Sequence, residues 1–467
     1  MNTFDNLTLK AFVKENTDFI KGARIQKVQQ PTRRELILVL RKNSDTKKLY
    51  ININPQFYHL CFMSKENEAL REIKIPQKPP MFCMQLRKHL ENAKITRINQ
   101  PAEERIFEIY IETYDELQEK IELCLAVELM GKHSNIILYN ADTNVILGCA
   151  HNVGADKSSV REVIGGLPYV YPPKQSKKYT PESIDSDRNI NDIIDDFFAA
   201  KISENNLKSL RLELINFVQK QIQGLNKQCK LIEKIFENDK NYEEYKHLGD
   251  LIMANLYSLK DYSSKITVFD YETNAEREIV TDENLTLKEN AQNYYKKYTK
   301  IKKRTKKNTE ILENYRQKLN YYEDILYFIK NATGINDLNE IKQELQPDTK
   351  PKTEKTTTIT EIEINGYKVF IGKNNKQNDY IVSKLAKDED FWFHVQNATG
   401  SHILLKCSKP DDKMIFECAK LAKEFSSVKD SSKAGVIYTK AKYLKKPPKS
   451  PLGYVTYKNE QEIVIGR

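Results

Sequence analysis

The sequence predicts an α+β multidomain protein: an N-terminal α/β domain, a long antiparallel coiled-coil arm and a C-terminal α+β domain. At 467 residues, the chain is too long for one ordinary hydrophobic core. Apolar residues with heptad spacing fill its middle part. A run of proline, threonine and charged residues then precedes a last segment with strand and turn patterns. We place the domains at 1–175, 199–346 and 359–467, with linkers at 176–198 and 347–358.

The N-terminal segment alternates between helix and strand patterns. Thr8–Phe19 has helical apolar spacing, and Pro79-Pro80 opens a second helix, in which every fourth residue from Phe82 to Leu90 is apolar. The turn residues 43–45 separate the first two strand patterns. Strands are expected at Glu35–Leu40, Lys48–Ile53, Ile106–Ile111 and Ile121–Glu128.

The middle of the chain carries two seams whose residues recur after three and four positions, which is typical of a coiled coil. The first seam comprises Ile215, Val218, Ile222, Leu225, Cys229, Ile232 and Phe236. The second comprises Tyr294, Tyr298, Ile301, Thr305, Asn308, Leu312, Tyr315, Leu319, Tyr322, Leu326 and Ile329. Because a shorter insert (about 247–287) joins them, we expect an antiparallel hairpin. The insert should form a short helix and two strands, Lys265–Asp270 and Glu276–Val280.

The last segment reads as a small α+β domain. Asn365-Gly366 is a strong type I′ turn signal between strands at Thr360–Ile364 and Lys368–Ile371. A helix is expected at Met414–Phe425. Further strands are expected at Gly435–Tyr438 and Gly453–Tyr457.

Composition indicates a soluble cytosolic protein. The formal net charge is +10, no apolar run approaches the roughly 18 residues of a membrane helix, and no secretory signal is visible. The seven cysteines are scattered and form no Cys-x-x-Cys pair, which favours reduced thiols over disulfides or a zinc site. We expect no membrane association, no metal and no cofactor.

One stretch, residues 388–406, concentrates unusual side chains: the single tryptophan Trp392, the histidines His394 and His402, and the Gly400-Ser401-His402 turn. Two interpretations stay open. These groups form a surface for an anionic partner, or the alternating aromatic residues simply fill a core. Since a turn separates the two histidines, we do not expect them to share a strand face.

Two lysine-rich runs raise the same choice between nucleic-acid binding and an ordinary solvated face. The section 288–307 of the second seam holds nine lysines and arginines against one acid. The run 429–449 interleaves lysines with Tyr438 and Tyr443, and aromatic residues among cations suit RNA, because bases stack while lysines meet phosphates.

No catalytic constellation is present in the sequence. Phosphate-loop, dinucleotide-binding and H-E-x-x-H motifs are absent, and a Ser401–His402 nucleophile is disfavoured because adjacent side chains rarely point at each other. We therefore expect a binding protein and not an enzyme.

Several long motifs, in order along nearly the whole chain, resemble the NFACT family, most closely its bacterial branch, once called fibronectin-binding protein A-like. In the N-terminal domain (NFACT-N) they are PPMFCMQLRKHL (79–90), ELMGKHSNIIL (128–138) and GGLPYVYPPKQ (165–175). The arm carries GDLIMANLY (249–257) and ENAQNYYKKYTKIK (289–302). The C-terminal domain (NFACT-R) carries GKNNKQND (372–379), DFWFHVQNATGSHI (390–403) and YTKAKYLKKP (438–447).

The resemblance implies a ribosome quality-control factor. Such a protein binds large (50S) ribosomal subunits obstructed by peptidyl-tRNA, recruits alanyl-tRNA and directs untemplated alanine addition to the stalled chain, while the ribosome supplies the chemistry. The partners implied are 23S rRNA, a stalk-base protein, both tRNAs and a small RqcP-type protein, in a cytoplasmic, ribosome-associated complex. A ribosome- or RNA-binding protein without tailing activity and a fibronectin-binding adhesin are the alternatives.

The resemblance also assigns residues. The family's tRNA-contacting Asp-Arg pair reads Glu104-Arg105 here, and Arg87 and Lys88 are further tRNA candidates. Lysines and an arginine of the arm are expected to face rRNA: Lys296, Lys297, Lys300, Lys302, Lys303 and Arg304. The NFACT-R signature comprises Asp390, Trp392, His394, Gly400, Ser401, His402, Lys442, Lys445 and Lys446.

Two family features are changed in this sequence. The helix-hairpin-helix module expected between NFACT-N and the arm is missing or reduced. NFACT-N should share the N-terminal fold of Fpg/Nei DNA glycosylases, but the chain starts Met1-Asn2-Thr3 without their N-terminal proline, so glycosylase chemistry is not expected.

Overall fold

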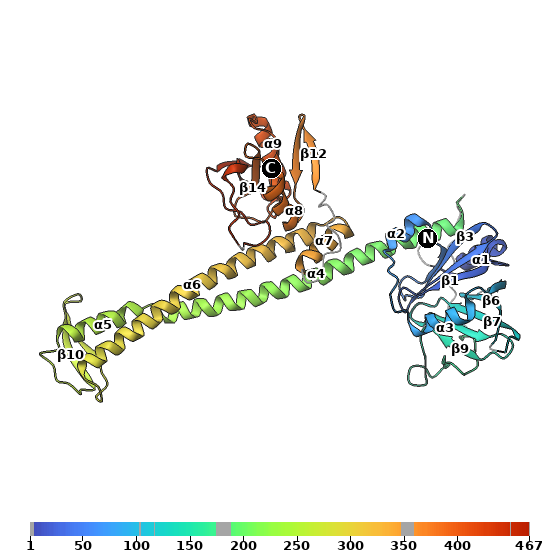
Figure 1. Ribbon diagram of the computed structural model, residues 1–467, viewed down its shortest axis with the longest axis horizontal. Helices are drawn as coiled ribbons and strands as arrows, with labels where there is room; N and C mark the ends of the chain where they lie inside the picture. Colours follow the sequence, from blue (N-terminus) through green and yellow to red (C-terminus); the bar gives the residue numbers. More distant parts are fainter. Residues whose placement is uncertain are drawn as a thin grey trace. The chain divides into compact units, whose positions relative to one another are not determined.

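The structure is a computed structural model that describes residues 4–101, 104–115, 117–173, 188–346, 359–448 and 450–466 (Figure 1). Two compact units, residues 1–206 and 207–467, are each described by themselves. The predicted linker 347–358 and most of the predicted linker 176–198 lie outside the described residues.

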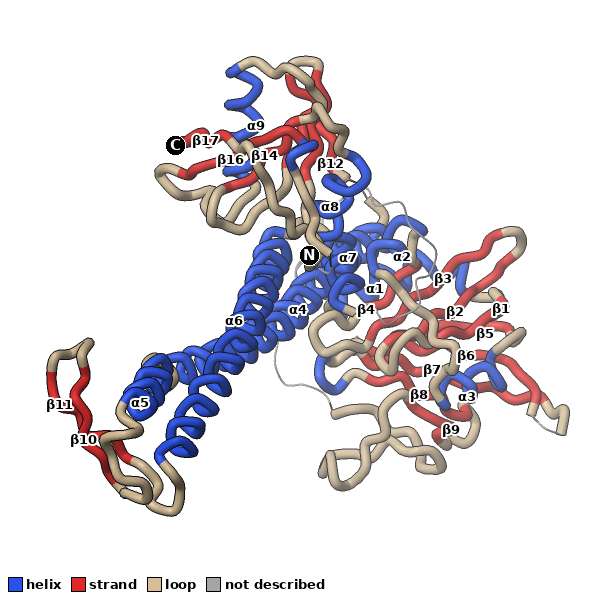
Figure 2. Tube along the Cα trace, turned by 60° about the vertical axis from the view of Figure 1, so that its left-hand side comes forward, coloured by secondary structure: helices blue, strands red, loops and turns tan. Residues whose placement is uncertain are grey.

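The first unit is built on a nine-stranded, antiparallel sheet in the order β4-β3-β2-β1-β5-β6-β7-β8-β9 (Figure 2). Three helices accompany it: α1 (Asn6–Ile20), α2 (Lys65–Arg71) and α3 (Met81–Leu90). The strands are β1 (Arg24–Gln29), β2 (Glu35–Lys42), β3 (Asp45–Asn52), β4 (His59–Phe62), β5 (Lys94–Asn99), β6 (Ile106–Tyr114), β7 (Lys120–Glu128), β8 (Asn135–Asn140) and β9 (Ile146–Cys149).

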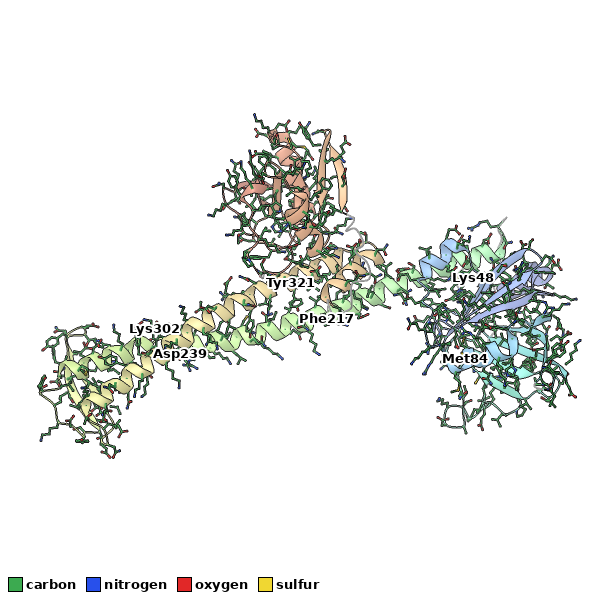
Figure 3. The ribbon with its side chains drawn as sticks, in the orientation of Figure 1. Lys48, Met84, Phe217, Asp239, Lys302 and Tyr321 are labelled. Carbon is green, nitrogen blue, oxygen red and sulfur yellow. The ribbon has the colours of Figure 1, made fainter. Side chains whose placement is uncertain are left out.

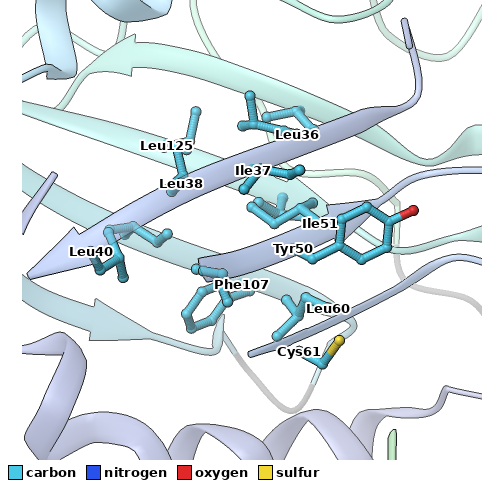
Figure 4. Packing of buried hydrophobic residues seen from close by; sticks show 14 of the residues in the cluster. Leu36, Ile37, Leu38, Leu40, Tyr50, Ile51, Leu60, Cys61, Phe107 and Leu125 are labelled. Carbon is cyan, nitrogen blue, oxygen red and sulfur yellow. The ribbon is translucent and has the colours of Figure 1, made fainter. Parts of the chain in front are cut away.

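On β6 and β7, alternate residues fill one core, as their apolar pattern requires, and residues between them belong to a second buried cluster on the other face of the sheet. Leu38 of β2, Phe107 of β6 and Leu125 of β7 are fully buried within this core (Figure 4). Leu9 and Phe12 of α1 cover the core together with the three predicted face residues of α3: Phe82, Leu86 and Leu90. The two helix predictions are confirmed.

A helix–turn–strand unit occurs twice in this domain, as α1–β1 and as α3–β5. Both turns contain a residue with positive φ, Gly22 (86°) and Asn92 (68°). Their backbones bond reciprocally: Gly22 N donates to Ile95 O at 2.9 Å, and Asn92 N donates to Ile25 O at 2.7 Å. The loop after β5, which carries Glu104 and Arg105, therefore has a counterpart after β1.

The first turns of α4 (Ile190–Asn238) belong to this unit and are held by a buried ion pair. Arg71 Nη1 of α2 lies 2.7 Å from Asp195 Oδ1, and both side chains are almost fully buried. Asp195 also accepts hydrogen bonds from Ser64 N and from Asn67 Nδ2. Residues 190–198, which the sequence suggested were linker, are therefore helical because their apolar and acidic side chains pack on this domain.

The second unit contains the predicted coiled-coil hairpin. α4 runs antiparallel to α6 (Leu287–Asn331), and Val218, Cys229 and Ile232 of α4 pack with Leu312 and Ile325 of α6. At the turn of the hairpin lies a small subdomain of α5 (Tyr242–Ala254), β10 (Lys265–Asp270) and β11 (Ala275–Val280). α7 (Ile335–Leu345) packs against α4 and α6 at the other end.

The C-terminal domain is a six-stranded antiparallel sheet in the order β12-β13-β15-β14-β16-β17. Its strands are β12 (Thr360–Ile364), β13 (Tyr367–Ile371), β14 (Phe391–Val395), β15 (Ile403–Leu405), β16 (Ala434–Lys440) and β17 (Gln461–Ile465). α9 (Asp412–Glu424) packs on one face, and α8 (Asn375–Tyr380) continues into a π-helical turn, η3 (Ile381–Leu385).

Most predicted elements of this domain are confirmed, with one error. The β12–β13 hairpin turns at Asn365 (φ 51°) and Gly366 (φ 80°), as its type I′ signal predicted. The strand expected at Gly453–Tyr457 is wrong, because this segment makes only an isolated bridge between Lys445 and Thr456. Gln461–Ile465 pairs with β16 instead.

Candidate nucleic-acid interface

The predicted tRNA-contacting pair lies directly before β6, on the side of the sheet where β7 ends. The Arg105 backbone carbonyl accepts a hydrogen bond from Leu129 N at 2.9 Å. Its guanidinium donates to Tyr58 OH at 2.9 Å and lies 5.5 Å from the centre of that ring. Tyr58 therefore fixes the direction of the Arg105 side chain. The preceding residue, Glu104, is half-buried. Direct RNA contact by the pair stays a prediction.

The α3 candidates have different environments. Arg87 Nε donates to Val28 O at 2.9 Å and lies 3.8 Å from Glu91, so part of its hydrogen-bonding capacity serves the fold. Lys88 is exposed one position further along the helix.

A basic concave surface in the same domain was not predicted from the sequence. It encloses about 940 Å³ and is lined by the loop after β1, by the turn before β8 and by the segment 147–165. Its exposed cations Arg33, Arg34, Lys132 and Lys157 have no carboxylate partner in the described part of the chain. Burial, helped by the charges of Arg34, Arg33 and Lys157, lowers the pKa of His151 in its wall.

These four cations form a suitable electrostatic footprint for a phosphate backbone. They come from three separate places in the sequence, at 33–34, 132 and 157, so composition along the chain gives no local peak. The helix–turn–strand repeat was the available signal, because it relates the loop bearing Arg33 and Arg34 to the loop bearing Glu104 and Arg105.

On the arm, five of the six predicted rRNA contacts are exposed lysines. Lys302 is labelled in Figure 3, near Asp239, which directly follows α4. The Lys302 ammonium donates to Tyr298 OH at 2.8 Å, and the Lys297 ammonium lies over the rings of Tyr294 and Tyr245. The remaining exposed lysines are Lys296, Lys300 and Lys303.

Arg304, the sixth predicted contact, pairs across the hairpin. Its Nε donates to Asp239 Oδ2 at 2.9 Å, and Nη2 donates to the other carboxylate oxygen. This bidentate pair joins the two arm helices, so much of its charge is already neutralised.

In the C-terminal domain, Asn378 of the motif at 372–379 forms two hydrogen bonds to the backbone of the turn at 400–402, and we call this arrangement the Asn378 clamp. Asn378 Oδ1 accepts a hydrogen bond from His402 N at 3.0 Å, and its amide donates to Gly400 O at 3.4 Å. A Cβ at Gly372 would lie 2.1 Å from Asn378 Oδ1, so glycine is required for this approach. The polar loop therefore fixes the turn that precedes β15.

The same motif joins the C-terminal domain to the arm. Asn374 Nδ2 and Gln377 Nε2 both donate to Glu340 Oε2 of α7, at 2.9 and 3.0 Å. The amide side chains of Asn374, Gln377 and Asn378 are therefore structural.

The signature stretch contributes to a core and to a pocket. Phe393 of β14 is buried under α9, which confirms the core interpretation for one strand face. On the other face, Trp392 is 1% exposed, and its ring stacks on His394 with centroids 5.7 Å apart. The structure thus confirms the core interpretation for Phe393 and Trp392, and the interpretation of this stretch as a surface for an anionic partner stays a prediction.

The expectation that His394 and His402 would not share a face is wrong. Their ring centroids are 5.3 Å apart and nearly perpendicular. The turn itself brings them together, because it folds β15 back beside β14 and pairs Phe393 with Ile403, so that His394 and His402 are cross-strand neighbours.

Other signature residues are structural. Asp390 accepts hydrogen bonds from Lys406 Nζ at 2.6 Å and from Lys387 N at 2.7 Å. Gly400 lies so close to Ser426 that a Cβ would be 3.0 Å from the serine Cβ. Ser401 is buried, and its backbone N–H donates to Phe425 O.

The three signature lysines differ in charge compensation. Lys442 lies 2.8 Å from Glu389, where hydrogen bonds from Lys440 and Lys442 lower the glutamate pKa to about 2. Lys446 pairs with Asp379. Among the described residues, only Lys445 of the three has no carboxylate partner.

Comparison with protein families decides what these domains are. The family model for the "NFACT N-terminal and middle domains" matches residues 5–190 and 177–359, and the model for the "NFACT protein RNA binding domain" matches residues 357–459. The chain belongs to the NFACT family. Its first domain, its arm and its last domain are accordingly NFACT-N, the NFACT middle region and NFACT-R.

Curated relatives within the family cover nearly the whole chain. "Rqc2 homolog RqcH" of Bacillus subtilis (strain 168) is 26% identical, over 99% of this chain and 98% of its own length. The protein of the same name from Streptococcus pneumoniae (strain D39) is also 26% identical, with the same coverage. The Bacillus alignment has 565 positions against 467 residues here, so that relative contains segments which this NFACT chain lacks.

Two solved structures, both of parts of one streptococcal protein, are similar to parts of this chain. The N-terminal part of the fibronectin/fibrinogen-binding protein of Streptococcus suis is 33% identical, covering 37% of this chain and 62% of its own, with a TM-score of 0.35. The C-terminal part of that protein is 24% identical, covering 56% of this chain and 95% of its own, with a TM-score of 0.43.

Within the described residues, no three histidine, cysteine or acidic side chains gather in a way that could hold a metal ion. A helix long and apolar enough to span a membrane is not found in that part of the NFACT chain either.

Proposed function

We propose that the protein is a ribosome quality-control factor that works by binding RNA. The observation that carries this proposal is similarity to RqcH proteins along 99% of the chain, ending in an NFACT RNA-binding domain. Unpaired cations on NFACT-N and exposed lysines on the arm support it, because both suit a phosphate backbone.

In its full form, the proposed activity has three steps. The protein binds a large (50S) subunit that retains peptidyl-tRNA, recruits alanyl-tRNA and directs untemplated addition of alanine to the stalled chain. The ribosome catalyses peptidyl transfer, so the protein itself is not an enzyme. It is cytoplasmic and ribosome-associated, with 23S rRNA, a stalk-base protein and a small RqcP-type protein as proposed partners.

The residues divide between these steps. Glu104, Arg105 and Lys88 of NFACT-N contact tRNA, and the arm lysines face rRNA. Arg105 is the sharpest candidate, because Tyr58 holds its guanidinium in a defined direction while leaving it half-buried.

Purification of the tagged protein from cells tests the proposal. Large subunits carrying peptidyl-tRNA should co-purify, enriched in one tRNA species, and the association should weaken as salt rises. Failure to bind such subunits even at low salt would exclude the function.

A single substitution tests the residue assignment. Arg105→Ala should abolish tRNA recruitment and leave subunit binding unchanged. The control Arg41→Ala removes an exposed arginine of the same domain and should change neither. Equal loss of tRNA and subunit binding in Arg105→Ala would contradict the assignment.

One observation favours a second candidate, an RNA- or ribosome-binding protein without tailing activity. The RqcH alignment is longer than this chain. Between β9 and α4, the described residues (150–173 and 188–189) contain no helix. Subunit binding without enrichment of any tRNA would identify this candidate.

A further inference from the structure

A pocket of about 480 Å³ lies between the NFACT-R sheet and α6. This volume is within the range of small-molecule sites, roughly 300–1,000 Å³. The sheet side contributes the aromatic groups Trp392, His394, His402 and Tyr457, and α6 contributes Tyr321 and Asp324. Two of the three NFACT-R motifs contribute to this pocket: Asn375 and Asn378 come from the motif at 372–379, and Trp392, His394 and His402 come from the motif at 390–403.

The aromatic wall is rigid. The Trp392 ring stacks on His394, meets His402 edge-on at 5.1 Å and lies 5.9 Å from Tyr457. The backbone N–H of His402 is fixed by its hydrogen bond to Asn378 Oδ1. Tyr457, which is 38% exposed, and the half-buried His394 offer the accessible ring surface of this wall, and they lose little conformational freedom when a planar ligand stacks on them.

Two buried polar atoms of this wall have no hydrogen-bond partner within the described part of the chain: Trp392 Nε1 and His402 Nδ1. Their side chains are 1% and 4% exposed. An unpaired polar atom in such a place costs stability unless another group completes its hydrogen bond. The indole offers a donor, and the imidazole nitrogen donates or accepts according to its tautomer.

The pocket carries no positive charge. Among the residues that the structure describes, no lysine or arginine lines it. Burial lowers the pKa of His394 to about 4 and that of His402 well below its usual range, so both rings are neutral at pH 7. Burial raises the pKa of Asp324 to about 7, which leaves a carboxyl that is partly protonated near neutrality. A phosphate or carboxylate would find no cationic partner among the described lining residues, whereas an uncharged heterocycle needs none.

Cations lie in the neighbouring depression. It shares Glu323 and Thr399 with the pocket and is also lined by Lys330 of α6 and by Lys429. A ligand with a neutral planar part and an attached phosphate would thus meet aromatic groups in one depression and ammonium groups in the next.

We infer that this pocket binds a single unpaired nucleobase of an RNA strand, while the adjoining Lys330 and Lys429 contact the phosphates of that strand. The inference rests on the proposed RNA-binding function and adds the form of RNA that is recognised. Double-stranded RNA keeps its bases stacked, so the preferred ligand is a single strand, a loop or a bulge.

Trp392 is the chain's only tryptophan, so its fluorescence reports on this pocket alone. The full-length protein is titrated with single-stranded hexaribonucleotides of each base and with an abasic hexamer of the same backbone charge. Base-containing RNA should change the emission of Trp392 in a saturable way. The abasic RNA should leave it unchanged and bind about five- to a hundredfold more weakly, as expected for the loss of base stacking.

Variants separate the pocket from the cations. Ala398→Phe fills the pocket from its turn and should lower affinity for base-containing RNA to the abasic level. The double variant Lys330→Ala, Lys429→Ala should weaken binding of both RNAs equally. Lys409→Ala, an exposed lysine elsewhere on NFACT-R, is the matched control and should change neither.

Equal affinity and equal fluorescence response for base-containing and abasic RNA would overturn the pocket inference while leaving RNA binding in place. An unchanged Ala398→Phe variant with a native melting temperature would overturn it too. If neither RNA binds at low salt, both this inference and the proposed function fail.

Discussion

The four cations of the basic concave surface should set the salt dependence of RNA binding. Arg33, Arg34, Lys132 and Lys157 are exposed and have no carboxylate partner in the described residues, so each is available to displace a counterion from RNA. One such contact contributes roughly 0.7–0.9 to the slope of log K against log salt concentration. Replacing all four by alanine should therefore flatten the slope by about 3.

The assay is titration of fluorescently labelled tRNA, followed by anisotropy, at several salt concentrations. The matched control replaces four lysines that already pair with carboxylates, and it should change the slope by less than about 1. These are Lys265, Lys368, Lys440 and Lys446, paired with Glu278, Glu361, Glu389 and Asp379. An unchanged slope in the test variant, or an equal change in the control, would refute the reasoning that charge compensation decides which cations bind RNA.

Three further predictions concern stability and can be read by thermal or denaturant unfolding. Asp195→Ala leaves the Arg71 guanidinium buried without its partner and should cost about 3–5 kcal/mol, whereas a loss below about 1 kcal/mol would mean that the pair is not buried in solution. Gly372→Ala forces a Cβ against the Asn378 amide and should cost about 1–3 kcal/mol, with wild-type stability counting against the clamp. Burial raises the pKa of Asp324 to about 7, above its value in the unfolded chain, so the folded state binds the extra proton and stability should fall as pH rises from about 4 to 7. Asp324→Asn should flatten this part of the pH–stability profile. Identical profiles for the variant and the wild type would contradict the assignment.

Local signals gave much of the fold correctly. The heptad seams identified the arm helices, and Asn365-Gly366 identified the β12–β13 hairpin, because both depend on residues close in sequence. The strand expected at Gly453–Tyr457 failed because its backbone partners were taken by a different segment, and strand pairing is a long-range choice. The lysine-rich runs are visible in the sequence, but the sequence does not show which of these lysines pair with a carboxylate in the folded protein.

The sequence by itself determined the order of the domains, the antiparallel arm and the NFACT signature motifs. Only the tertiary structure decided which signature groups meet. His394 and His402 became neighbours through a hairpin, and Lys446 was neutralised by Asp379 from a distant segment. The physical reason is that burial and charge compensation depend on groups brought together by folding, and spacing along the chain does not encode them.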